Sequence, residues 1–167
     1  MQQGSTHLFL DSNILLSRTL RDWFCLIDLE SGAEGIRLRW SEDVLAEFLY
    51  HLRKRNPSAS EVVTGGLRRR LENACPDAMV EGYSIRAELI ASGRDEFDAH
   101  VVAAAEHGLV DYLVTNNIKH FEPFREECEF EICTADDMLC LVDERRPGVV
   151  LISGAETAAL LGQETQR

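Results

Sequence analysis

The sequence predicts an α/β protein with three layers, in which helices cover both faces of a central parallel sheet. Short apolar runs alternate along the chain with amphipathic segments of helical period. Polar residues follow some of these runs directly. Asp11 follows the run 7–10, and Asn116 and Asn117 follow the run 112–115. Helices that connect parallel strands bring all such strand ends to one edge of the sheet, where ligands bind in open α/β folds.

The first part of the chain predicts two strands, each followed by a helix. The apolar run 7–10 predicts a short buried strand, and Ser12 is the expected N-cap of the helix after it. Residues 36–40 alternate apolar and basic side chains, which favours a second strand. The polar triplet 41–43 predicts the start of a second helix, which the Asn-Pro pair at 56–57 stops.

The middle of the chain predicts shorter elements. We expect a helix over 58–74, weakened by two adjacent glycines, and then a short strand within 79–84. Asp95 is the expected cap of a helix that ends at Gly108. The run 112–115 predicts the next buried strand.

The last part of the chain predicts two further strands and two helices. Residues 131–134 favour a core strand, and Thr134 and Asp137 have the spacing of a capping box for the helix that follows. The run 149–152 predicts an edge strand, and 154–161 a terminal helix.

Length and charge limit the possible functions. The length fits a single domain over 1–167, with a core of roughly 7–146 and a strand-and-helix extension over 147–167. Asp and Glu number 29 against 17 Lys and Arg, for a net charge of -12. This balance argues against indiscriminate binding to nucleic acid or to an anionic membrane. It does not exclude a nucleic-acid enzyme, because acids gathered around metal ions also lower the net charge.

Cysteine and histidine patterns indicate neither a zinc site nor a redox motif. The five cysteines are irregularly spaced and include no CxxC pair. His100 and His107 fall on one predicted helix, where we interpret them as ordinary helix residues. Residues 1–6 lack the basic start and apolar run of a signal peptide, and no apolar run approaches the length of a membrane span. We therefore expect a cytoplasmic protein with no membrane association.

Four polar side chains are expected to surround one pocket at the strand ends. Asp11 and Asn117 leave neighbouring strands at the carboxyl end. Asp98 lies in the first turn of its helix, and Glu47 borders the apolar stripe of another. Crowded carboxylates repel one another unless a cation neutralises them, and oxygen ligands favour Mg²⁺ or Mn²⁺ over zinc. Such a metal site is suited to hydrolysing the phosphodiester backbone of a nucleic acid.

The same four residues lie, in order, in the segments 10–15, 40–48, 95–105 and 113–121. Together these segments resemble the motifs of PIN-domain nucleases, most of all the VapC-type toxins of bacterial toxin–antitoxin pairs. The resemblance implies a Mg²⁺- or Mn²⁺-dependent endoribonuclease in which Asp11 and Asp98 bind metal. It further implies that Glu47 positions metal or water and that Asn117 orients the hydrated ion. An RNA substrate, a cognate antitoxin whose tail enters the acidic groove, and a homodimer are the implied partners.

The resemblance has two departures and leaves some neighbouring residues with lesser roles. Asn117 stands where many family members have a fourth aspartate, and a neutral amide adds no charge for a second metal ion. Asp95 is an extra acid that can either partly compensate for the missing charge or cap its helix, and we favour the helix cap. Ser12, Asn13 and Thr115 are expected to donate hydrogen bonds to the acids.

Each site residue also has a plainer interpretation. Asp11 and Asp98 can serve as helix-terminal acids, Glu47 can be a solvated helix residue and Asn117 a turn former. Their occurrence together after separate core elements favours the functional interpretation. The basic runs 53–55 and 68–70 form either two solvated helix faces or a rim that binds phosphates.

Two other functional classes remain open. The first is a non-catalytic PIN-like module that binds RNA or protein. The second is another α/β phosphoryl-transfer protein, either an aspartate-nucleophile phosphatase or a receiver domain. Phosphatases of that kind have Asp-x-Asp after the first strand, where this chain has Asn13, and receivers have adjacent acids that are missing here.

Overall fold

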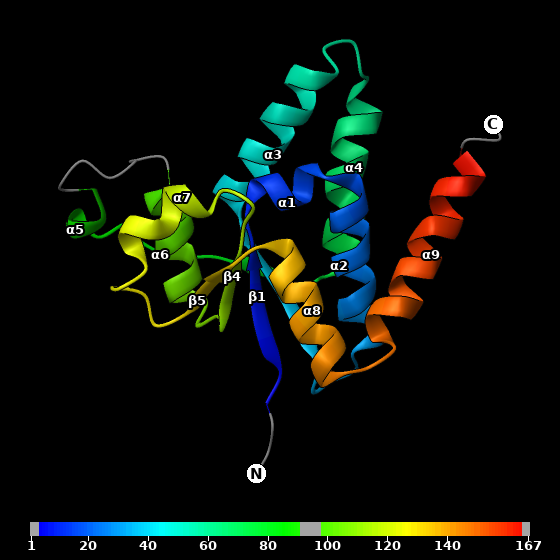
Figure 1. Cartoon of the computed structure of the whole chain (residues 1–167). Helices are drawn as coiled ribbons and strands as arrows, with labels where there is room; N and C mark the ends of the chain where they lie inside the picture. The colour runs from blue at the N-terminus through cyan, green and yellow to red at the C-terminus, as the bar shows by residue number, and fades with distance from the viewer. Residues whose placement is uncertain (1–3, 91–97, 165–167) are drawn as a thin grey trace.

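A five-stranded parallel sheet forms the centre of the molecule. The computed structural model describes residues 4–90 and 98–164 (Figure 1). The strands are β1 (Thr6–Leu10), β2 (Ile36–Ser41), β3 (Met79–Val80), β4 (Tyr112–Val114) and β5 (Glu131–Cys133). Their order in the sheet is β3-β2-β1-β4-β5, and every pair is parallel. The five strands predicted between residues 7 and 134 are confirmed in place, and all of them end at the same edge.

Helices cover both faces of this sheet, as the sequence predicts. They are α1 (Ser12–Leu16), α2 (Arg18–Glu30), α3 (Glu42–Arg55), α4 (Glu61–Ala74), α5 (Ala87–Ile90), α6 (Ala99–His107), α7 (Ile118–Phe121), the 3₁₀ turn η1 (Glu122–Phe124), α8 (Ala135–Arg145) and α9 (Val149–Glu164). In Figure 1, α2, α8 and α9 lie on one side of the strands, and α6 and α7 lie on the other. The three-layer α/β/α class is therefore confirmed.

The core is built from side chains on both faces of the central strands and on the inner faces of the helices. Phe9, Trp40 and Phe48 are fully buried, and residues 101–105 of α6 are all buried. The buried face of α6 packs against β2 and β3. None of the helices in the described ranges has the length and hydrophobicity required to cross a lipid bilayer.

The first helix differs from the prediction at both of its ends. Asp11, not Ser12, is the N-cap of α1, and its carboxylate accepts a hydrogen bond from the Ser12 backbone. The helix then breaks at Ser17, whose hydroxyl caps α2 through the Leu20 amide. Asp11 therefore follows β1 directly and caps α1, and this double role fixes its carboxylate at the edge of the sheet.

The predicted edge strand at 149–152 is wrong, because these residues begin α9. Valine and isoleucine favour strands, but α9 packs along α2, and this tertiary contact overrides the local preference. The Trp23 indole donates to the Val150 carbonyl at 3.0 Å, and Gly154 lies against the indole ring. The capping box of Thr134 and Asp137 at the start of α8 is confirmed.

Candidate functional site

Asp11 is the centre of a hydrogen-bond network at the carboxyl end of β1. Its side chain is almost fully buried, with 5% of the residue surface exposed. Oδ1 accepts from the Ser12 amide at 2.7 Å. Oδ2 accepts from Asn13 Nδ2 at 2.6 Å and from Thr115 Oγ1 at 2.8 Å. The three residues predicted to support the acids, Ser12, Asn13 and Thr115, thus all contact Asp11.

The same network joins the ends of neighbouring strands. Thr115 follows β4 and is completely buried, and its hydroxyl also accepts from the Asn117 amide at 3.1 Å. Asn13 Oδ1 accepts from the Asn116 amide at 3.0 Å. Asn116 Oδ1 in turn accepts from the Ala135 amide at 3.3 Å. Asn116 is absent from the predicted site, although it follows the same buried strand as Asn117 and could have been predicted from the sequence in the same way.

Burial makes the ionised form of Asp11 costly. Desolvation raises the pKa of Asp11 above its usual value, and the hydrogen bonds from Thr115 and Ser12 oppose this effect. The negative charge of Glu47 raises the pKa of Asp11 further, which places the two carboxylates within electrostatic reach of each other. Within the described residues no lysine or arginine forms an ion pair with Asp11, so a bound cation would relieve its charge.

Glu47 and Asp98 come from the helices next to this network. Glu47 lies on α3, its side chain is 39% exposed, and its Oε1 lies 3.6 Å from His51 Nε2. Its Oε2 lies 3.9 Å from His100 Nε2 on α6. Asp98 is the N-cap residue of α6, and its Oδ2 lies 3.2 Å from His120 Nδ1. Within the described residues its side chain makes no capping bond to α6, which disfavours the plain helix-cap interpretation.

The remaining predicted site residues lie in different settings. Asn117 is the exposed N-cap residue of α7, and its position next to Thr115 places it at the same edge of the sheet as Asp11. Asp95 lies outside the described residues. Three histidines outside the predicted site, His51, His100 and His120, lie next to these acids. His100 stands two residues after Asp98, but only the packing of α3 against α6 brings it to Glu47.

The donor chemistry at this edge fits a hard divalent cation. Asp11, Glu47 and Asp98 offer carboxylate oxygens, and Asn117 offers an amide. A buried carboxylate with a raised pKa and a second acid within reach is the setting in which a cation is stabilising. Among residues 4–90 and 98–164, however, no three acidic, imidazole or thiol groups gather closely enough to form a preassembled metal cage. Binding an ion therefore requires the longer side chains to turn inward.

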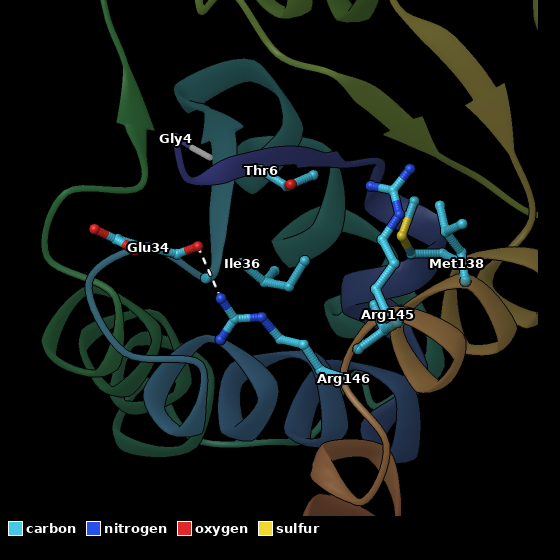
Figure 2. A pocket seen from close by; sticks show the side chains of 10 residues that line it. Gly4, Thr6, Glu34, Ile36, Met138, Arg145 and Arg146 are labelled. Carbon is cyan, nitrogen blue, oxygen red and sulfur yellow. Dashed lines mark hydrogen bonds between the residues drawn. The ribbon is translucent and has the colours of Figure 1, made fainter. Parts of the chain in front are cut away.

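A cavity of about 480 Å³ lies at the opposite edge of the sheet (Figure 2). It is lined near the amino end of β1 by Thr6 and on α8 by Met138. The Arg146 guanidinium is held there by the carbonyls of Ser31 and Glu34, at 2.6 and 2.9 Å. The cavity thus lies away from the Asp11 network, which occupies the carboxyl ends of the strands.

The basic runs on α3 and α4 include several side chains with structural partners. Arg68 forms a paired hydrogen bond with Glu42 and an ion pair with Glu72. Arg53 donates to the backbone carbonyls of the α3–α4 turn. Both arginines therefore tie the two helices together. Arg69 is exposed and forms an ion pair with Glu61, and Lys54, Arg55 and Arg70 are exposed as well.

Comparisons with known proteins agree with this architecture. The VapBC-1 structure from nontypeable Haemophilus influenzae aligns with a TM-score of 0.55 and 13% identity, over 78% of this chain and 99% of that one. The structure of VapBC2 from Rickettsia felis, bound to a DNA fragment from their promoter, aligns with a TM-score of 0.52 and 20% identity. That alignment covers 77% of this chain and 98% of the other. None of the curated proteins compared matches the chain.

At these identities the two structures support the fold, and the family is shown by sequence. The PIN domain family model matches residues 7–119. The matched segment covers more than half of the chain and contains Asp11, Glu47 and Asp98 together with Thr115 and Asn117. The chain therefore belongs to the PIN domain family.

Proposed function

We propose that this protein is a metal-dependent endoribonuclease that hydrolyses RNA phosphodiester bonds and acts as the toxin of a toxin–antitoxin pair. The observation that carries the proposal is Asp11, a buried carboxylate held by three hydrogen-bond donors at the strand ends of a PIN domain. Such a fixed acid costs stability in the folded chain, and the cost is understandable if it binds a cation.

The proposed roles follow the positions of the side chains. Asp11 and Asp98 would hold Mg²⁺ or Mn²⁺, which when bound polarises the scissile phosphate and acidifies water. Glu47, on a longer and half-exposed side chain, would position metal or water. Asn117 would orient the hydrated ion. Asn13 and Thr115 keep the Asp11 carboxylate in one orientation through hydrogen bonds to Oδ2.

The partners follow from the two similar structures. Both are VapBC complexes, and this supports a cognate antitoxin for this chain, with a tail that enters the acidic groove. We further propose a cytoplasmic location, where an RNA substrate is available, and a homodimer. The five cysteines are free thiols in the structure, as expected for a reducing compartment.

The direct test is cleavage of a structured RNA by the purified protein in the presence of Mg²⁺ or Mn²⁺. Asp11→Asn and Asp98→Asn should each reduce cleavage by at least a hundredfold, since each removes a charged ligand. Asp143→Asn, which changes an exposed acid on α8, is the matched control and should cleave like the wild type. Equal activity of all four proteins would exclude this mechanism.

A non-catalytic PIN-like module is the second candidate, and Asn117 is the observation that favours it. An exposed amide at this position contributes no charge to a metal site. Calorimetric titration with Mn²⁺ separates the two functions. A wild-type protein that binds RNA, takes up no Mn²⁺ and cleaves nothing would support the binding module.

A further inference from the structure

The cavity at the amino ends of β1 and β2 combines apolar and cationic side chains (Figure 2). Its volume of about 480 Å³ is in the range of cavities that hold small-molecule ligands. Ile36 from β2 and Met138 and Leu141 from α8 form the apolar part of its lining. Arg145 and Arg146, at the end of α8, line the same cavity. Its lining therefore suits a ligand that has both an apolar part and a negative charge.

The two guanidinium groups are held at neighbouring strands of the sheet. Arg146 donates to the Glu34 carbonyl, which precedes β2, at 2.9 Å. Arg145 donates to the Tyr112 hydroxyl on β4 at 3.3 Å. In the sheet β1 lies between β2 and β4, so its first residue, Thr6, lies between the two arginines, as Figure 2 shows.

Neither of these positive charges is neutralised by a carboxylate. Within the described ranges Arg145 and Arg146 form no ion pair, although the chain has 29 acidic residues against 17 basic ones. Glu34 lines the cavity, but its carbonyl is the group that Arg146 binds, and its carboxylate points away in Figure 2. Other arginines do pair with acids, among them Arg68, Arg86 and Arg125. The positive charge at the cavity is therefore available to an anion.

Hydrogen-bond donors at the cavity are also available. A guanidinium carries its N–H donors in a planar fork, and the contacts of Arg145 and Arg146 within residues 4–90 and 98–164 use only some of them. The Thr6 hydroxyl has no hydrogen-bond partner in the described part of the chain. An anion between the two arginines would thus meet donors from both of them and from β1.

We propose that this cavity binds a small organic phosphate, with the phosphate group between Arg145 and Arg146 and the apolar part against Met138 and Leu141. A planar carboxylate matches the fork of one guanidinium, whereas a tetrahedral phosphate has oxygens for both guanidinium groups and for Thr6. The apolar side chains add affinity for an organic group, because its binding removes apolar surface from water. The cavity shares no lining residue with the candidate metal site, so the two sites are independent.

The test uses the full-length protein with ¹³C-labelled methionine methyl groups, without added metal ions. Adenosine 5′-monophosphate is the probe, because it joins a phosphate to a flat ring system that can pack on apolar side chains. Its addition should shift the NMR signal of Met138 and leave that of Met79 on β3 unchanged. Inorganic phosphate and adenosine, each added alone, should bind more weakly than the monophosphate by roughly tenfold or more.

A substitution tests the role of the arginine pair. Arg145→Gln should weaken binding of the monophosphate by roughly tenfold or more, since it removes a charged donor. Arg145 is chosen because Arg146 also holds the chain before β2 through backbone carbonyls. Arg69→Gln is the matched control, because it removes the same charge from an exposed arginine that does not line the cavity.

The outcomes are decisive and separate from the proposed function. A Met138 signal that does not move with millimolar monophosphate overturns the proposal, and this result needs no variant to fold. Equal affinity of Arg145→Gln and the wild type also overturns it. Octanoate that binds as tightly as the monophosphate would overturn a phosphate as the ligand. A protein that binds the monophosphate at Met138 but cleaves no RNA would keep this inference and remove the proposed function.

Discussion

Asp11 is held in place by the same burial that makes its charge unfavourable. The amide of Ser12 and the side chains of Asn13 and Thr115 direct its two oxygens, and they supply hydrogen bonds in place of water. These bonds offset part of the desolvation but do not cancel it, because the pKa of Asp11 remains raised. The ionised Asp11 carboxylate therefore costs the folded state free energy unless a positive charge compensates it.

This balance predicts the pH dependence of stability. The folded pKa of Asp11 lies above its unfolded value, so the folded state retains this proton over a pH range in which the unfolded state has lost it. The contribution of Asp11 to the free energy of unfolding is therefore complete below about pH 3.9 and falls as the pH rises through the folded pKa. Urea unfolding of the wild type and of Asp11→Asn should be compared from pH 4 to pH 8 without metal. The free energy of unfolding of the wild type should fall relative to that of the variant as the pH rises.

Addition of Mn²⁺ at neutral pH should raise the free energy of unfolding of the wild type only, because the variant has lost the charged ligand. A difference between the two proteins that does not change with pH would contradict the assignment of the raised pKa to Asp11.

At the scale of elements, the basic residues of α3 and α4 are of two kinds: some are bound to neighbouring carboxylates, and others are exposed and able to contact phosphates. Arg68 lies between Glu42 and Glu72, and these carboxylates raise its pKa above the usual value for arginine. Arg70, two residues further on the same helix, is exposed. Neighbours in sequence with the same side chain are thus expected to have different functions.

Paired substitutions test this separation. Arg68→Gln should lower the free energy of unfolding by about 1 kcal/mol, less at high salt, since its ion pairs are partly solvated. Arg70→Gln should leave unfolding unchanged but weaken RNA binding, and it should reduce the slope of log affinity against log salt by about one. Filter binding at several salt concentrations measures this. A slope that is unchanged in an Arg70→Gln, Lys54→Gln and Arg55→Gln triple variant would remove the phosphate-binding rim.

The elements also show what the sequence can and cannot predict. The central strands were predictable because short buried apolar runs are followed by polar residues, as at Asp11 and Asn116. The break at Ser17 was not, because the apolar period continues across it and only the hydrogen bonds reveal two helices. The proximity of His100 to Glu47 could not be predicted for a related reason. Its distance to Glu47 depends on how α3 crosses α6, which no local pattern records.

At the scale of the whole molecule, α9 adds a layer outside α2. The start of this helix contacts Trp23 on α2 and continues from α8, so the C-terminal segment closes over the face away from α6 (Figure 1). The Asp11 network is built from the ends of β1 and β4 and receives no hydrogen bond from α9 among the described residues. Changes at the α2–α9 contact should therefore affect stability and leave cleavage intact.

Two helical glycines make this expectation measurable. A Cβ at Gly154 would lie 3.1 Å from the Trp23 ring, whose indole is held by its bond to Val150. At Gly66 on α4, the nearest atom would be 3.9 Å away, at the end of a flexible arginine. Gly66→Ala should stabilise the protein by roughly 0.5–1 kcal/mol, as expected for alanine in a helix interior. Gly154→Ala should lose that gain and destabilise it by about 1–3 kcal/mol through overpacking.

Chemical unfolding of both variants, together with RNA cleavage, gives the comparison. Because the two substitutions are chemically identical and both lie within helices, the helix propensity term cancels between them, and the remaining difference reports the packing of α9 on α2. Equal stability of the two variants would mean that α9 does not pack against Trp23 in solution. Loss of cleavage in a folded Gly154→Ala protein would instead show that this outer layer supports the strand ends at which Asp11 lies.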